Sequence, residues 1–449
     1  MFKKAVLSFL LMSMFSFGVQ ISLTASADLP TFTTRFDVDL VGRFNVFSFG
    51  GQLYFSSDGK FYSGQSRFYF GYYFDAAQGW LGLNLENLNL KIGKFVEGDV
   101  VESPYSLFIT SEDMSLIGAR LKYENDWLFL VTRWMGLTKE VSVSSGVYPY
   151  SFPDRGANFK AAGLKLGDFR MGYEEVTVYT GRFFDFEYFA SVIPTFFVQY
   201  TEYEGRPYRQ GTNDNAIMGF FADYRVHDLY IYGQILVDDF NMNRFMFPES
   251  YQNPDKIAWA VGCKLRLGTL TIYAHHAGAT EYTFEPPSPD NPYGYVHFPA
   301  AVAPLGSATR MLCPEENYVG FKYGENTLAF MGGVEAEAFG ISFDLGGELV
   351  LSGSKSYNNP WHELKNFPEG THLLDDERIE RTFRFWVSAE KAFDWGNIFA
   401  RAAWKSVENP LKVVEGADGD GEVLVPAEGQ ESSVSLIFGV RVDFNLGGG

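Results

Sequence analysis

Polar and apolar residues alternate along much of this chain. Residues 35–40 have the sequence RFDVDL, and residues 384–390 repeat the alternation with RFWVSAE. In residues 432–446, leucine, phenylalanine and valine at even positions alternate with mostly polar residues and glycine. Successive side chains of an extended strand point to opposite faces, so a period of two predicts β-strands with one apolar and one polar face.

The alternation predicts about 18 strands, within a range of 16 to 20. Both ends of a single-chain barrel are expected on the short-turn side, which makes the number even. Residues 317–338 fit either one strand or a hairpin followed by a strand. The other strands are expected at residues 32–42, 44–55, 66–74, 79–86, 88–96, 114–123, 126–136, 158–166, 168–179, 183–190, 195–203, 215–225, 228–239, 256–266, 269–282, 341–352, 378–390, 396–407 and 432–446.

The connections between these strands alternate in length. Tight turns such as Gly167-Asp168 and Gly268-Thr269 separate long polar stretches, which lie near residues 97–113, 137–157, 240–255, 284–316, 353–377 and 408–431. Short periplasmic turns on one rim and long extracellular loops on the other are typical of outer-membrane barrels. The sequence therefore predicts an all-β fold, a single transmembrane antiparallel β-barrel.

The first 27 residues have the three parts of a secretory signal. Lys3 and Lys4 form a charged start, an apolar stretch runs to about Val19, and Ala25-Ser26-Ala27 is a small-residue cleavage motif. We expect residues 1–27 to be removed and residues 28–449 to form the barrel, located in the cell outer membrane. An uncleaved anchor helix is the alternative.

Composition narrows the class of protein. Mean hydropathy is −0.10, which excludes a bundle of membrane helices, and 46% hydrophobic with 20% charged residues excludes a disordered chain. A formal charge of −19 without a basic stripe argues against nucleic acid as a partner. The two cysteines, Cys263 and Cys313, are expected to be free thiols, with a disulfide between them as the alternative.

Alternation also assigns the charged strand residues to a face. Arginine or lysine at the lipid midplane costs roughly 2–4 kcal/mol, so charges are expected in the lumen. The lumen candidates are Arg35, Lys91, Arg120, Lys122, Arg170, Arg225, Lys264, Arg266, Arg384, Arg401, Lys405 and Arg441. A lumen of this kind would favour small anionic solutes or an acidic surface polysaccharide. The alternative is that these cations pair with carboxylates across strands and simply fill a polar interior.

The last strand carries a candidate assembly signal. Gly439, Val442 and Phe444 have the spacing expected for recognition by the barrel-assembly machinery, although Ile437 replaces a polar residue and five residues follow the aromatic. We therefore expect outer-membrane lipid and that machinery as partners.

Signals for catalysis or cofactors are weak. His275 and His276 are adjacent on a predicted strand and would point to opposite faces, so they cannot share a metal ion. Residues 418–422 resemble the start of a calcium loop but lack the later glutamate, which favours a flexible acidic loop. The sequence predicts no enzyme activity, no cofactor and no metal, with a serine–histidine lipase in the barrel wall as the alternative.

One region resembles a known family. Residues 232–240 (YGQILVDDF) precede residues 254–262 (PDKIAWAVG), followed by EYT at 281–283, YVH at 295–297 and PLG at 304–306. This order resembles the Wzi-type capsule-assembly outer-membrane barrels. The resemblance implies an 18-stranded barrel that helps attach surface polysaccharide. A porin-like channel for small solutes is the alternative function.

Overall fold

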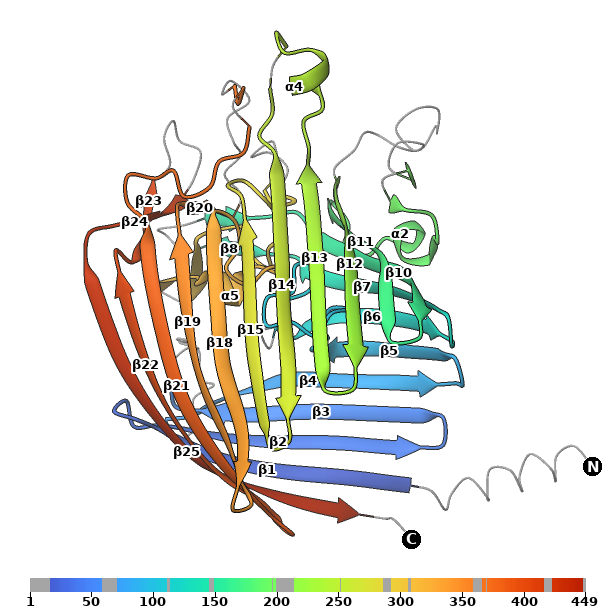
Figure 1. The fold of residues 1–449 in the computed structure, drawn as a ribbon, viewed down its shortest axis with the longest axis vertical. Coiled ribbons are helices and arrows are strands. Elements are labelled where there is room, and N and C mark those ends of the chain that lie inside the picture. The colour runs from blue at the N-terminus through green and yellow to red at the C-terminus, as the bar shows by residue number, and fades with distance from the viewer. Residues whose placement is uncertain are drawn as a thin grey trace, which may run out of the picture.

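The computed structural model describes most of the chain (Figure 1). The described residues are 17–58, 71–110, 114–144, 149–195, 197–198, 214–250, 252–285, 292–305, 308–357, 366–368, 370–415 and 422–446.

Eighteen antiparallel strands form one closed barrel, which confirms the predicted all-β fold and its central strand number. β1 pairs with both β2 and β25, and this double pairing closes the sheet. The wall strands are β1 (Phe17–Leu29), β2 (Thr33–Phe44), β3 (Phe47–Ser56), β4 (Tyr73–Asn84), β5 (Leu88–Phe95), β6 (Leu116–Glu124), β7 (Leu128–Thr138), β10 (Arg155–Leu166), β11 (Phe169–Thr180), β12 (Asp214–Val226), β13 (Leu229–Asp239), β14 (Lys256–Leu267), β15 (Leu270–Ala279), β18 (Thr327–Ala338), β19 (Ile341–Ser352), β21 (Glu380–Phe393), β22 (Gly396–Glu408) and β25 (Gln430–Leu446).

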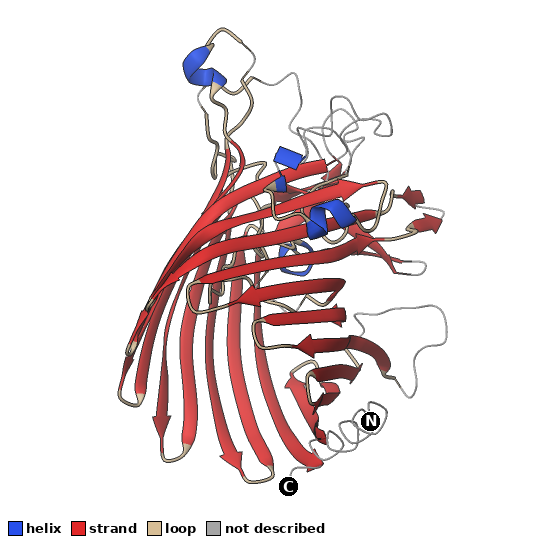
Figure 2. Cartoon of the chain, turned by 90° about the vertical axis from the view of Figure 1, so that its right-hand side faces the viewer, coloured by secondary structure: helices blue, strands red, loops and turns tan. Residues whose placement is uncertain are grey.

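The two rims of the barrel differ as the sequence predicted. On one rim, which we call the short-turn rim, eight connections contain two or three residues each. The loop rim carries the long connections and one short one at residues 30–32. Figure 2 shows the loops gathered at one end and the tight turns at the other. β1 begins and β25 ends on the short-turn rim, because the strand number is even.

Smaller elements lie within the long connections of the loop rim. They are the hairpin β8 (Ser142–Ser144) and β9 (Pro149–Ser151), the hairpin β16 (Val302–Leu305) and β17 (Ala308–Met311), the sheet of β20 (Lys355–Ser356), β24 (Glu422–Pro426) and β23 (Leu411–Glu415), and the helices α2 (Phe186–Ala190), α4 (Asn243–Met246) and α5 (Pro314–Asn317). Among the described residues, no helix is long and apolar enough to cross a membrane.

Two differences from the predicted strands lie near the N-terminus. β1 was not predicted, and the boundary expected at Ala27 falls inside this wall strand. The two strands predicted at residues 66–74 and 79–86 are a single strand, β4, in the described part of that range. A bulge at Ala77, where the register against β3 shifts by one residue, interrupts the alternation without ending the strand.

Two further predictions concern the middle of the chain. The strand predicted at residues 183–190 is wrong, because the Asp185 side chain accepts hydrogen bonds from the backbone N–H groups of Glu187 and Tyr188 and caps α2 instead. The described residues of 195–203 contain no strand. Residues 317–338 contain one wall strand, β18, and no additional hairpin.

Residues 181–195 and 197–198, which we call the outer flap, fold back over the outside of the wall. The Trp134 indole N–H donates to the Phe183 carbonyl at 2.8 Å, and the Thr132 hydroxyl donates to the Phe189 carbonyl at 2.8 Å. Under the flap, Lys160 and Glu175 form an ion pair at 3.3 Å, with side chains only 6% and 1% exposed. The flap thus shields a charged patch on the outward face of β10 and β11.

Candidate functional site

The lumen is entered by the connection between β5 and β6, which we call the first inward loop (residues 96–115). It crosses to the far wall: the Ser103 hydroxyl lies 2.6 Å from the Tyr232 hydroxyl, and the Tyr105 hydroxyl donates to Glu348 at 2.7 Å. The backbone N–H of Leu107 donates to the Gln234 side chain at 2.9 Å. Tyr232 and Gln234 belong to β13 and Glu348 to β19, so the loop spans the barrel interior.

A second inward loop (the described residues of 280–326, between β15 and β18) packs against the first. The Thr110 N–H donates to the Val319 carbonyl at 2.6 Å, and the Tyr295 hydroxyl donates to the Phe108 carbonyl. The rings of Phe108 and Phe159 lie 6.3 Å apart, which joins the loops to the inner face of β10. The two loops therefore form one body with the wall.

Apolar side chains from both loops and from inward-facing wall positions make one core inside the barrel. Tyr105, Leu107 and Phe108 of the first loop are fully buried, as are Tyr295 and Tyr318 of the second. A packed apolar core offers neither water nor polar groups to a passing ion. The described parts of both loops thus pack inside the barrel near the loop rim.

Carboxylates of the inward loops bind cations of the wall. Lys91 and Arg120 both pair with Glu97 of the first loop, the lysine at 3.7 Å. Arg225 pairs with Glu102 of the same loop at 2.7 Å. In the second loop, Glu315 on α5 pairs with Arg384. These ion pairs therefore fasten both inward loops to the wall.

Most of the other lumen candidates also have partners on the wall. Arg170 binds Asp223, Lys122 binds Glu124, Lys264 binds Glu335, Arg35 binds Asp37, and Arg441 binds Asp443. The Arg266 guanidinium donates to the Gly268 carbonyl at 3.2 Å. No described carboxylate forms an ion pair with Arg401 or Lys405. Arg170 and Lys264 show the cross-strand pairing considered as the alternative from sequence, whereas the partners of Lys122, Arg35 and Arg441 lie two residues away on the same strand.

Two central cations were missed from sequence. Arg133 on β7 is 1% exposed, donates to the Glu97 carbonyl at 3.2 Å, and lies over the Phe95 ring. Arg155 is fully buried and donates to the carbonyls of Gly294 at 2.5 Å and Val296 at 3.2 Å, which fastens the second loop. Alternation could have placed Arg133 in the lumen. No local sequence pattern indicates the role of Arg155, because its partners are about 140 residues away along the chain.

A buried carboxyl pair lies where the second inward loop meets β20. The Ser356 N–H donates to Glu325 at 2.6 Å, and the carboxyl group of Glu285 is buried beside that of Glu325. Burial raises the pKa of Glu325 to about 7 and the pKa of Glu285 well above its usual value. Burial lowers the pKa of Lys355, whose ammonium donates to the Glu325 carbonyl at 2.5 Å, to about 8.

Small cavities remain around the inward loops. One of about 140 Å³ is lined by Glu97, Arg120, Arg133 and Arg170. Another of about 220 Å³ lies between α5 and the wall, where Arg384 and Lys405 line it together with Glu315, Glu380 and Glu431. Their size suits water molecules or one small polar group.

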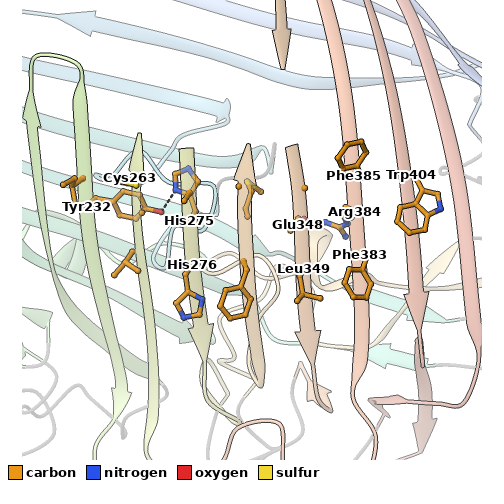
Figure 3. A pocket seen from close by; sticks show the side chains of 18 residues that line it. Tyr232, Cys263, His275, His276, Glu348, Leu349, Phe383, Arg384, Phe385 and Trp404 are labelled. Atoms are coloured by element: carbon orange, nitrogen blue, oxygen red, sulfur yellow. Dashed lines mark hydrogen bonds and ion pairs between the residues drawn. The ribbon is translucent and has the colours of Figure 1, made fainter. Parts of the chain in front are cut away.

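The larger hollow, of about 930 Å³, lies mainly on the outer face of the wall (Figure 3). Its floor is formed by small residues such as Gly332 and Gly347, between the aromatic side chains of Phe383, Phe385 and Trp404. These positions share the outward face by their register. The hollow therefore faces lipid and gives no passage through the barrel.

The adjacent histidines point to opposite faces, as predicted. His275 faces the lumen and bonds the Tyr232 hydroxyl at 3.0 Å, whereas His276 faces outward and accepts from the Trp259 indole N–H at 3.1 Å (Figure 3). Cys263 and Cys313 are free thiols, as expected. Of the acidic segment 418–422, all but its last residue lies outside the described residues.

Gly439, Val442 and Phe444 all lie in β25. Phe444 is 46% exposed on the outward face. Gly439 faces the lumen, and a Cβ atom added there would lie 2.1 Å from the Phe399 ring. Packing thus gives this glycine a role of its own beside the predicted one in assembly.

No protein-family model matches the chain, and no curated protein sequence matches it. Among solved structures, the chain is similar to Wzi of Escherichia coli, described as an outer membrane protein involved in group 1 capsule assembly and as a carbohydrate-binding β-barrel. The TM-score is 0.53 at 11% identity, over 98% of this chain and 88% of that one. This likeness shows a distant outer-membrane β-barrel fold and does not extend to membership of the Wzi family.

Two proteins of Pseudomonas aeruginosa align with lower scores. OccK3 (OpdO) has a TM-score of 0.47 at 11% identity, over 98% of this chain and 99% of that one. OccD3 (OpdP) has a TM-score of 0.46 at 10% identity, over 96% of this chain and 91% of that one.

Proposed function

We propose that this protein is a non-enzymatic barrel of the outer membrane that holds or helps assemble surface polysaccharide with its loop rim. The observation that carries the proposal is the occupied lumen. Two inward loops share one apolar core with the wall, and their carboxylates neutralise wall cations. A diffusion porin needs a continuous water-filled path, so a closed barrel supports the holding role over the conducting one.

The likeness to a carbohydrate-binding barrel supports polysaccharide as the class of ligand. An acidic polymer would meet the wall cations that lack a carboxylate partner among the described residues. Lys405, which lines the cavity beside α5, is one of them. Attraction between a polyanion and these cations should weaken as salt screens it.

Planar-bilayer recording of the full chain tests the closed lumen. We expect no steady opening of porin size. A variant with Tyr105, Leu107 and Phe108 replaced by serine should conduct, because the first inward loop loses its apolar anchors. A steady open pore in the unaltered protein would instead favour the porin alternative.

Polysaccharide binding is tested with purified protein in detergent, an acidic bacterial polysaccharide and neutral dextran as the control. We expect salt-sensitive binding to the acidic polymer, weakened in Lys405→Glu. The matched control is Arg266→Glu, which carries the same charge change at the short-turn rim, away from the loops. Equal behaviour of dextran and the acidic polymer would contradict the proposal.

A further inference from the structure

The leader contains two motifs that a signal peptidase could recognise. Both have small residues at the first and third positions before the cut: Ser16-Phe17-Gly18 and Ala25-Ser26-Ala27. The charged start and the apolar stretch from Ala5 to Phe15 fit either motif, since signal peptides of 15 to 30 residues with apolar stretches of about 7–15 are usual. The sequence rules for signal peptides therefore do not decide between the two cleavage sites, but the structure of the barrel does.

Residues 19–29 have the pattern of a wall strand. Valine, isoleucine, leucine and alanine at odd positions alternate with polar residues at even positions. The polar side chains take part in the lumen network: the Ser22 hydroxyl donates to Asp443 at 2.5 Å, and the Ser435 hydroxyl donates to Asp28 at 2.8 Å. Ser22 is 2% exposed. Residues 19–29 therefore belong to the barrel wall.

Cleavage after Ala27 would remove eleven of the thirteen residues of β1. β1 runs antiparallel to both β2 and β25, so these two strands are parallel to each other. Without β1 they would have to form a new parallel pair in a 17-stranded barrel, or leave open edges. Unpaired backbone groups are not tolerated in the hydrocarbon region.

Cleavage after Gly18 would leave the barrel complete. The pairing of β1 with β25 begins at Val19, opposite Leu446, so every pair of that register is kept. Against β2, the pairs at Phe17 and Gly18 are lost and all later ones remain. The mature N-terminus would then lie beside Leu446 on the short-turn rim, where an even-stranded barrel has both of its ends.

We propose that the export signal is cleaved between Gly18 and Val19, and that the mature chain begins with β1. The Ala25-Ser26-Ala27 segment is then a stretch of wall rather than a processing site. This assignment concerns residues 16–19 and is independent of what the loop rim binds.

N-terminal sequencing and intact mass of the protein from the outer-membrane fraction test the proposal. We expect a mature chain that begins at Val19. A chain that begins at Asp28 or at any other residue after Val19, or that keeps the leader, overturns it. This readout uses the unaltered protein and needs no variant to fold.

Two matched variants add a second readout. Gly18→Leu should leave the precursor unprocessed, because a large residue occupies the position before the cut. Ala27→Leu should be processed like the unaltered chain, since Ala27 pairs with Phe438 on the outward face, where leucine is compatible with lipid. Loss of processing in Ala27→Leu with normal processing in Gly18→Leu would overturn the assignment.

Discussion

At the scale of single residues, the face on which a side chain lies decides what a charge costs. On β14, Val261 and Leu265 point outward and are 48% and 38% exposed. Arg266, the next residue, points inward and bonds the carbonyl of Gly268. Leu265 lies two residues from the short-turn rim, whereas Val261 lies near the middle of the strand.

Three substitutions on β14 test this assignment. Val261→Arg should destabilise the barrel by roughly 2–4 kcal/mol and Leu265→Arg by about 0–1 kcal/mol, because the penalty for a lipid-facing charge falls toward the interface. Arg266→Glu should leave folding nearly unchanged. The measurement is urea unfolding in lipid vesicles. A greater loss of stability for Arg266→Glu than for Val261→Arg would show that the two faces have been assigned the wrong way round.

Alternation was enough to predict where many residues point but not which contacts they make. Arg120 and Arg384 could be assigned to the lumen from sequence, yet their partners Glu97 and Glu315 come from loops that looked extracellular. Arg155 was placed in a loop, although it opens β10 and is fully buried. Contacts across such long separations depend on the closed fold, which no local pattern encodes.

At the scale of elements, the second inward loop should respond to pH. The pKa of Glu325 is about 7 in the folded protein and near 4.5 when exposed, because burial disfavours its charge. The folded state therefore holds a proton that the released loop gives up. The resulting stabilisation is complete below about pH 4.5 and is lost as pH rises to about 7.

Hydrogen exchange of residues 280–326 should therefore show stronger protection at pH 5 than at pH 7.5, after correction for the intrinsic exchange rate. Glu325→Gln should reduce this pH dependence, and Glu325→Gln combined with Glu285→Gln should remove most of it, since burial raises the pKa of both carboxyl groups and neither amide titrates. The deprotonation of Lys355 acts at higher pH and with opposite sign, because burial lowers the pKa of Lys355 to about 8. Protection that increases from pH 5 to pH 7.5 would contradict this account.

The last strand gives a second prediction at this scale. Deleting Phe444 and everything after it should reduce assembly into the outer membrane. The deletion removes the predicted terminal aromatic signal and also the pairs of Phe444, Asn445 and Leu446 with β1. Deleting only residues 447–449 serves as the control, and surface levels of both proteins are measured. Normal levels of the longer truncation would argue against the predicted signal.

Element boundaries followed from sequence wherever alternation was regular. β10, β11, β14 and β19 lie close to their predicted ranges. β1 was missed because an apolar leader and an alternating strand overlap near Val19. α2 was missed because Asp185 caps a helix within a segment rich in aromatic residues, a composition that favours strands in general.

At the scale of the whole molecule, closure and occupation of the barrel depend on each other. The first inward loop bonds β13 and β19, which are far from its own strands in the sheet order. The inward loops can be held in place only when these distant strands have come together in the wall. Folding should therefore be cooperative across the entire chain.

This cooperativity predicts a heat-modifiable protein. On an unboiled gel the folded chain should migrate differently from the boiled chain, and circular dichroism in detergent should be dominated by strands. Tyr105→Ser should lower the temperature of the gel shift, because it removes a fully buried ring and its bond to Glu348. A helix-rich spectrum would contradict the fold itself.

The outer flap also limits how far the bilayer can extend along the barrel wall toward the loop rim. Lys160 lies near the middle of β10, and its ion pair with Glu175 points away from the lumen. The flap that covers this pair has irregular backbone, which is not tolerated in hydrocarbon, so the bilayer must end below the flap on this side. On β21 and β22, exposed Phe383 and Trp404 continue the apolar surface to within a few residues of the loop rim. The apolar outer surface is thus shorter on the flap side than on the side of β21 and β22. We therefore expect the barrel axis to be tilted from the membrane normal in a fixed direction.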